Sequence, residues 1–209
     1  MTVDKKNSTK NIKITRDVLA QRIFKNANIK GVSLKDSKNM LESILEHIKT
    51  SVFGKGKILR IKNYGRLTPK IKPSGRPVRN PSKGDEYFME ETATVTLTKQ
   101  QGRSNKENRF TENQFILDFT STNNKLSKYE VSLAKITAQE LFNAIRETKE
   151  IGVRCEIREF AVFSSAMSNP RRARNPKTGE PVFVPSKPKA IFTISREFRK
   201  DLLKKLKEI

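Results

Sequence analysis

Residues 171–179 read Arg-Arg-Ala-Arg-Asn-Pro-Lys-Thr-Gly, and the interpretation of the whole chain starts from this stretch. Its centre is a turn, because an Asn-Pro pair followed by a glycine three residues after the proline is typical of a turn between two extended segments. Three arginines precede the turn with no acid among them, and a lysine lies inside it. The stretch therefore predicts a basic hairpin with a proline at its tip, a shape that suits a narrow and negatively charged groove.

The same pattern occurs earlier, at residues 76–84, as Arg-Pro-Val-Arg-Asn-Pro-Ser-Lys-Gly. Two predicted helices precede each copy, and their first residues are suited to capping: Thr15, Ser33, Thr111 and Ser127. Alternating apolar strands flank each hairpin. The turn glycines Gly56 and Gly152 lie as far apart as the corner aromatics Tyr64 and Phe160, and the second tip proline comes one residue earlier than that spacing requires. The sequence thus predicts a tandem duplication of one α+β unit.

The chain divides into four parts on this basis. Residues 1–11 are polar and lysine-rich, and we expect a disordered basic tail. Residues 12–99 form the first repeat, 100–108 a polar linker, and 109–209 the second repeat. The second repeat ends in a predicted helix from about Arg196, with Phe198, Leu202 and Leu206 on one face. The first repeat lacks a counterpart of this helix.

The net charge of this chain indicates which classes of partner it binds. The formal net charge is +22, with 44 Lys and Arg against 22 Asp and Glu, so the repulsion requires a polyanionic partner. Nucleic acid is the first candidate, since neutralised phosphates release counterions, and an anionic membrane surface is the second. No apolar run is long enough for a transmembrane helix, and the N-terminus lacks the apolar core of a signal peptide.

Cysteine and histidine are too scarce for most metal or disulfide chemistry. Cys155 is the only cysteine, which excludes an internal disulfide and favours a reducing, intracellular compartment. It occupies a strand position equivalent to Leu59, so we expect a small core residue. His47 has no second histidine or cysteine at ligand spacing, so a packed or surface role is expected and no metal site. The corner aromatics Tyr64 and Phe160 are expected in the core, although base stacking is an alternative.

Two helices, an aromatic corner and an Arg-x-x-Arg-Asn-Pro tip together resemble the bacterial HU and integration host factor family. The resemblance covers nearly the whole chain, in two tandem copies. It implies intertwined units whose two β-arms enter the minor groove of DNA, with a proline wedge at each tip, here Pro81 and Pro176. The remaining contact residues that it implies are Arg76, Arg79, Asn80 and Lys83 in the first arm, and Arg171, Arg172, Arg174, Asn175 and Lys177 in the second.

This chain departs from the family pattern in three ways. Lys83 stands where the pattern has threonine, and the corners around Tyr64 and Phe160 are not Gly-Phe-Gly. The first repeat lacks the C-terminal helix. Family members usually carry one repeat and dimerise, whereas here both repeats share one chain. We therefore expect an intramolecular pseudo-dimer with two arms, and a homodimer of whole chains with four arms is the alternative.

The leading hypothesis is an architectural protein that bends or compacts double-stranded DNA. No nucleophile–base pair, glycine-rich phosphate loop or carboxylate cluster indicates an enzyme, and no cofactor is expected. The alternatives are an RNA-binding or ribosome-associated basic protein, and a DNA-bending assembly factor for a recombination or packaging complex. We expect a cytoplasmic, nucleoid-associated protein, or one associated with a virion or phage if its origin is viral. Sequence-specific and sequence-tolerant binding both remain open.

Overall fold

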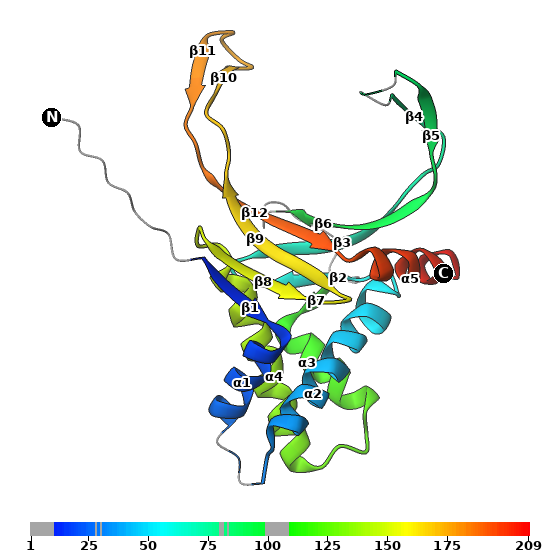
Figure 1. The fold of residues 1–209 in the computed structure, drawn as a ribbon, viewed down its shortest axis with the longest axis vertical. Coiled ribbons are helices and arrows are strands. Elements are labelled where there is room, and N and C mark those ends of the chain that lie inside the picture. Colours follow the sequence, from blue (N-terminus) through cyan, green and yellow to red (C-terminus); the bar gives the residue numbers. More distant parts are fainter. Residues whose placement is uncertain (1–10, 28, 30, 80–81, 83, 99–108) are drawn as a thin grey trace, which may run out of the picture.

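The computed structural model describes residues 11–27, 29, 31–79, 82, 84–98 and 109–209. The predicted linker, and the predicted basic tail apart from its last residue, lie outside these residues. Figure 1 shows helices at one end, sheets across the middle, and two hairpin arms that rise from the sheets on opposite sides. The arms lie at the end of the molecule opposite the main group of helices.

The first repeat begins with helices α1 (Arg16–Ala27) and α2 (Leu34–His47), and α2 continues into a π-helical turn, η1 (Ile48–Phe53). The predicted capping box at Ser33 is confirmed, because its hydroxyl accepts from the backbone N–H of Asp36 and the Asp36 carboxylate accepts from the backbone N–H of Ser33. The apolar positions of α2 recur every three or four residues and are buried as predicted.

The second repeat contains α3 (Glu112–Thr122), α4 (Lys128–Glu147) and the C-terminal helix α5 (Arg196–Lys207). Capping boxes open α3 at Thr111 and α4 at Ser127, as predicted. The hydroxyl of Ser195 caps α5 by accepting from the backbone N–H of Phe198. The helix starts therefore follow from short, local sequence signals that pair a capping oxygen with otherwise unsatisfied amides.

Two four-stranded sheets carry the arms. One contains β2 (Ile58–Ile61), β3 (Gly65–Lys72), β6 (Thr92–Thr98) and β7 (Arg109–Thr111), in the order β6-β3-β2-β7. The other contains β1 (Ile12–Thr15), β8 (Val153–Ile157), β9 (Ala161–Met167) and β12 (Pro188–Ile194), in the order β1-β8-β9-β12. Antiparallel pairing continues along β3 and β6 and along β9 and β12, so the root of each arm belongs to its sheet.

Each sheet is completed by a short strand from the other repeat. Strand β1 (Ile12–Thr15), which precedes α1, pairs in parallel with β8 of the second repeat. Strand β7 (Arg109–Thr111), which precedes α3, pairs in parallel with β2 of the first repeat. Local sequence patterns do not predict these two strands, because their partners lie far away along the chain. Their exchange joins the two repeats into one folded body.

One continuous apolar core runs through both repeats. The exchanged strands contribute Ile14, which lies opposite Cys155, and Phe110, which lies opposite Leu59. Ile14 and Cys155 have no solvent exposure, so the prediction that Cys155 is a core residue is confirmed. The corner aromatics Tyr64 and Phe160 are also buried, as expected for core residues.

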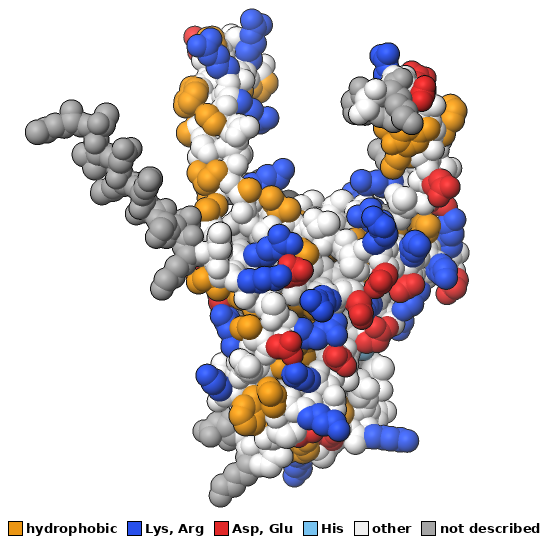
Figure 2. All heavy atoms as spheres, viewed as in Figure 1, with side chains coloured by type: hydrophobic (Ala, Val, Ile, Leu, Met, Phe, Trp, Pro, Cys, Tyr) orange, Lys and Arg blue, Asp and Glu red, His pale blue; other side chains and the backbone are white. Residues whose placement is uncertain are grey.

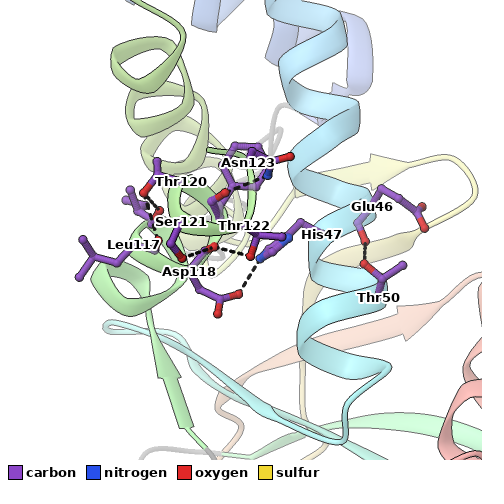
Figure 3. A network of polar contacts seen from close by, with 11 residues as sticks. Glu46, His47, Thr50, Leu117, Asp118, Thr120, Ser121, Thr122 and Asn123 are labelled. Carbon is purple, nitrogen blue, oxygen red and sulfur yellow. Dashed lines mark hydrogen bonds and ion pairs between the residues drawn. The ribbon is translucent and has the colours of Figure 1, made fainter. Parts of the chain in front are cut away.

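A polar contact inside the helical end joins the two repeats. His47 of α2 lies 2.8 Å, through its Nε2 atom, from Oδ2 of Asp118 in α3, and the imidazole is 6% exposed (Figure 3). The rings of Phe115 and Phe119 meet the imidazole edge-on at centroid distances of 5.6 and 5.3 Å. The single histidine is therefore packed between repeats, in line with the expectation of a packed role.

Helix α5 crosses from the second repeat to cover the first. Phe198 packs against Phe53 of η1, with ring centroids 6.1 Å apart, and against Phe160, at 5.6 Å. The helix also lies along β6, and Leu202 is completely buried. The C-terminal helix thus adds a third connection between the repeats, after the strand exchange and the packing of the other helices.

Candidate nucleic-acid interface

The second arm consists of β10 (Arg171–Arg174) paired antiparallel with β11 (Pro181–Val184). Hydrogen bonds close its tip: the N–H of Asn175 donates to the carbonyl of Glu180 at 2.9 Å, and the N–H of Gly179 donates to the carbonyl of Asn175 at 2.8 Å. Gly179 has a φ of 73°, a left-handed conformation that favours glycine. The predicted glycine-closed turn is therefore present at this tip.

The side chain of Asn175 shapes the apex of the turn. Its Oδ1 atom accepts from the N–H of Lys177 at 3.0 Å, which is the geometry of an Asx turn. Pro176 lies between these two residues and has no N–H to satisfy, and its fixed φ suits the turn. Both Pro176 and Lys177 are exposed. The turn consequently presents a rigid apolar ring, with a cation beside it, at the end of the arm.

The first arm pairs β4 (Arg76–Arg79) with β5 (Glu86–Met89) in the corresponding register. The Nε atom of Arg79 donates to the carbonyl of Gly84 at 3.3 Å, so this guanidinium braces the turn. Three predicted contact residues of this tip lie outside the described residues: Asn80, Pro81 and Lys83. Arg76 starts β4, opposite Met89.

Strand alternation distributes the arginines of the second arm over two faces. Successive side chains of a strand point to opposite faces, so Arg172 and Arg174 share one face and Arg171 lies on the other. All three are exposed. The structure therefore brings Arg172 and Arg174 together behind the tip and separates Arg171 from them, although the three are close in sequence.

Each arm carries an exposed phenylalanine that was not predicted from the sequence. Phe183 lies opposite Arg172 in the second arm and is 66% exposed, and Phe88 lies opposite Pro77 in the first arm and is 74% exposed. The signal that could have found them is their recurrence at the spacing of the two tip prolines. Large apolar side chains that face solvent at matching positions of two arms indicate a contact surface.

Both arms change direction where they leave the sheets. In the first, the break follows β3 at Pro73, and the N–H of Gly75 donates to the carbonyl of Met89 at 3.1 Å. In the second, Ser168 bridges the strands: its N–H donates to the carbonyl of Lys187 at 2.9 Å, and its carbonyl accepts from the Ser186 hydroxyl at 2.6 Å. These breaks separate the arm hairpins from their sheets, and the arms curve upward from the body (Figure 1).

Basic side chains lie on the second arm and on the body below the two arms (Figure 2). Figure 2 shows Lys and Arg side chains toward the end of the β10–β11 arm and over the body below the arms, with acidic groups among those on the body. Helix α5 adds a set of exposed cations: Arg196, Arg199, Lys200, Lys204 and Lys207. Clustered cations of this kind produce a positive field that attracts a polyanion.

The shifted pKa values lie in the body and not on the arms, among the described residues. Burial raises the pKa of the Cys155 thiol to about 12, so this thiol is protonated at neutral pH. No group of three or more His, Cys, Asp or Glu residues in the described part of the chain could hold a metal ion. Within the same residues, no helix is long and apolar enough to cross a membrane.

The model of the bacterial DNA-binding protein family matches the sequence twice, over residues 14–102 and 111–203. The chain belongs to this family. The two matches confirm the predicted family and its tandem duplication, and the helices and sheets confirm the α+β class. Membership of the bacterial DNA-binding protein family identifies the chain as an architectural DNA-binding protein.

Curated relatives of this family are integration host factor subunits. The beta subunit of Alkalilimnicola ehrlichii is 38% identical over 89 residues, which are 43% of this chain and 86% of that protein. The beta subunit of Shewanella pealeana is 35% identical over 89 residues, covering 43% of this chain and 90% of the relative. The alpha subunit of Actinobacillus pleuropneumoniae is 32% identical over 71 residues, covering 34% of this chain and 72% of the relative. Each relative thus corresponds to less than half of this chain.

Proposed function

We propose that this chain bends duplex DNA by inserting its two arms into the minor groove, with Pro81 and Pro176 as wedges between base pairs. An apolar wedge partly unstacks a base step and kinks the duplex, and the additional protein contacts offset the cost of unstacking. The exposed ring of Pro176 at the end of a hydrogen-bonded turn is the observation that carries this proposal. DNA is the partner, and we place the protein on nucleoid DNA, or on packaged viral DNA if its origin is viral.

The side chains behind the tip support entry into the minor groove. Arg172 and Arg174 lie on one face, opposite Phe183 and Pro181 of β11. Guanidinium groups favour a narrow minor groove, where the negative potential is strongest, and apolar surface suits the sugar edges that line it. In this arrangement the proline distorts the duplex, and the arginines hold the arm in the groove.

We further propose that one chain supplies both arms to one duplex. Two exchanged strands and helix α5 tie the repeats together, and the arms rise from the same end of the body (Figure 1). A second chain is therefore not required to complete either sheet. Sedimentation of the protein bound to a short labelled duplex tests this stoichiometry, and a two-chain complex on one minimal site would favour the four-arm homodimer.

Energy transfer between dyes at the two ends of a labelled duplex tests the wedge. The double variant Pro81→Ala with Pro176→Ala should still bind, because the cations remain, but should bring the ends less close together than the wild-type protein does. Pro185→Ala is the matched control, since this exposed proline lies at the root of the second arm and not at its tip. Equal bending by the double variant and the wild type would overturn the wedge mechanism.

Competition with structured RNA tests whether the protein prefers duplex DNA to RNA. A-form RNA has a wide, shallow minor groove, in which an arm that fits a narrow groove loses most of its contacts. Duplex DNA should therefore displace RNA at equal salt concentration. The RNA-binding alternative would be favoured if the two nucleic acids competed equally.

A further inference from the structure

Helix α5 occupies a well-defined seat formed by η1 and β6 of the first repeat together with Phe160 of the second. Phe198 fills it, between the rings of Phe53 and Phe160, beside strand β6. Two acids around the seat select a basic helix: Glu46 lies 4.0 Å from the ammonium of Lys205, and Glu91 pairs with Lys207. Apolar anchoring and charge complementarity together hold this helix in place.

The duplication creates a second seat at the equivalent place on the other repeat. Tyr64 corresponds there to Phe160, and strand β12 corresponds to β6. Lys149 corresponds to Phe53, because each precedes the turn glycine of its repeat, Gly152 or Gly56, by the same distance. A hollow of about 450 Å³ lies at this place, and its lining includes Tyr64, Leu97, Pro188, Ala190, Lys149 and Lys189. The apolar part of this lining is what a helix anchored like α5 would cover.

Among the residues that the structure describes, no helix with an aromatic anchor is left over for the second seat. Residues 99–108, which follow β6 as α5 follows β12, include no apolar side chain in their sequence. A second copy of the chain does not solve the problem, because each chain has one α5 and that helix already covers its own first seat. Residues 1–10 also include no aromatic side chain in their sequence, so we look for an occupant with an aromatic anchor in a different protein.

The lining of the second seat includes two lysines, whereas the charged side chains that pair with α5 in the first seat are acids. Lysines replace uncharged residues at two equivalent positions, with Lys149 in place of Phe53 and Lys189 in place of Thr94. The acid Glu91 of the first seat corresponds to Ser186 in the second. Lys149 donates a hydrogen bond through Nζ to the carbonyl of Asn63 at the rim of the hollow, which holds its charge there. A basic helix such as α5 would be repelled from this seat, and an acidic one would be attracted.

We propose that the second seat binds an acidic, amphipathic helix of a partner protein, with an aromatic side chain in the hollow beside Tyr64. The hollow is lined by residues of the body and of the start of β12, and no residue of the arm strands β4, β5, β10 or β11 lines it. Only one side of the pseudo-symmetric body offers it, and the protein therefore recruits one partner in one orientation. The proposal does not depend on how the arm tips contact DNA.

A labelled peptide tests this proposal by fluorescence anisotropy with the full-length protein. The probe has the sequence of residues 195–209 with every lysine and arginine replaced by glutamate, and it keeps the three apolar anchors of α5: Phe198, Leu202 and Leu206. We expect it to bind, and to bind more tightly than the unmodified, basic peptide. The same acidic peptide with Phe198→Ala controls for general attraction to a cationic protein, and should bind about tenfold more weakly or worse.

Variants of the protein locate the peptide. The double variant Lys149→Glu with Lys189→Glu should weaken binding of the acidic peptide about fivefold to tenfold and strengthen binding of the basic one. Ala190→Trp should fill the hollow and abolish binding of the acidic peptide. Lys128→Glu, an exposed position at the start of α4, is the matched charge control and should have a smaller effect than Lys149→Glu alone or Lys189→Glu alone.

Three results would overturn the proposal. The first is no difference between the acidic peptide and its anchorless control, and the second is unchanged binding to the Ala190→Trp variant. The third is loss of DNA affinity by the double lysine variant without any specific peptide binding, which would assign Lys149 and Lys189 to contacts with flanking DNA. Retained DNA bending in every variant would show that the two activities are separate.

Discussion

Replacing Ile14 with alanine tests whether the exchanged strand β1 holds the two repeats together. Ile14 belongs to the first repeat by sequence, but it lies opposite Cys155 of the second repeat and has no solvent exposure. Ile12 lies on the same strand, two residues earlier, and is 46% exposed. Ile12→Ala is therefore a matched control for the same chemical change in the same strand.

The expected losses in the free energy of unfolding differ several-fold between the Ile14→Ala and Ile12→Ala variants. Truncating a fully buried isoleucine to alanine removes apolar contacts and leaves a cavity, which costs about 2–5 kcal/mol of the free energy of unfolding. The half-exposed Ile12 should cost less than about 1 kcal/mol. For a domain of this size, the Ile14→Ala variant should melt about 4–20 °C below the wild type, and the Ile12→Ala variant within a few degrees of it.

Urea and thermal unfolding followed by circular dichroism give both values. Since Ile14 lies in a core shared by both repeats, the Ile14→Ala variant should still unfold in one transition with a lower midpoint. Equal losses for Ile14→Ala and Ile12→Ala would refute the docking of β1 against β8. Two separate transitions, of which only one moves, would show that the repeats are independently stable.

Three further measurements test the arms and the body. Arg174→Ala should reduce DNA affinity more than Arg79→Ala in titrations at fixed salt, because Arg79 already donates to a carbonyl of its own turn; equal losses would remove this asymmetry. Cys155, whose pKa burial raises to about 12, should react with a thiol reagent at mildly alkaline pH only after unfolding, and rapid labelling of the folded protein would contradict its burial. Hydrogen bonds from the capping serines lower the pKa values of Asp36 and Glu130 from 3.8 and 4.5, so their stabilisation is complete above these values and is lost as pH falls through the lowered ones. The melting temperature should accordingly fall on acidification below about pH 4, and less so in a variant with both acids replaced by alanine.

Much of the local structure could be predicted because its signals lie within a few residues of each other. In the capping boxes at Ser33, Thr111 and Ser127, a hydroxyl accepts from the backbone N–H three residues later, and the side chain there accepts from the backbone N–H of the first residue. All three capping boxes are present. The turn at Asn175 follows from the proline and glycine next to it. The duplication itself was visible because both tips carry the same pattern.

The candidate interface could be predicted only in part. The sequence grouped Arg171, Arg172 and Arg174 as one cluster, and strand alternation assigns them to two faces. The sequence pattern places Phe183 only in an apolar strand that flanks the hairpin, and a phenylalanine in an alternating strand is usually buried. Its exposure depends on the arm extending beyond the core, and the length of an unsupported hairpin is not encoded in local periodicity.

By itself, the sequence determined the tandem α+β repeats, the helix starts, the basic proline-tipped turns and the polyanionic partner. Only the tertiary structure decided how the repeats join: β1 and β7 exchange between sheets, His47 meets Asp118 across the helices, and α5 covers the opposite repeat. The physical reason is the distance along the chain between the residues that stabilise each element. Caps and turns are stabilised by neighbours along the chain, whereas the partner of a short strand or an amphipathic helix is whichever distant surface buries its apolar face.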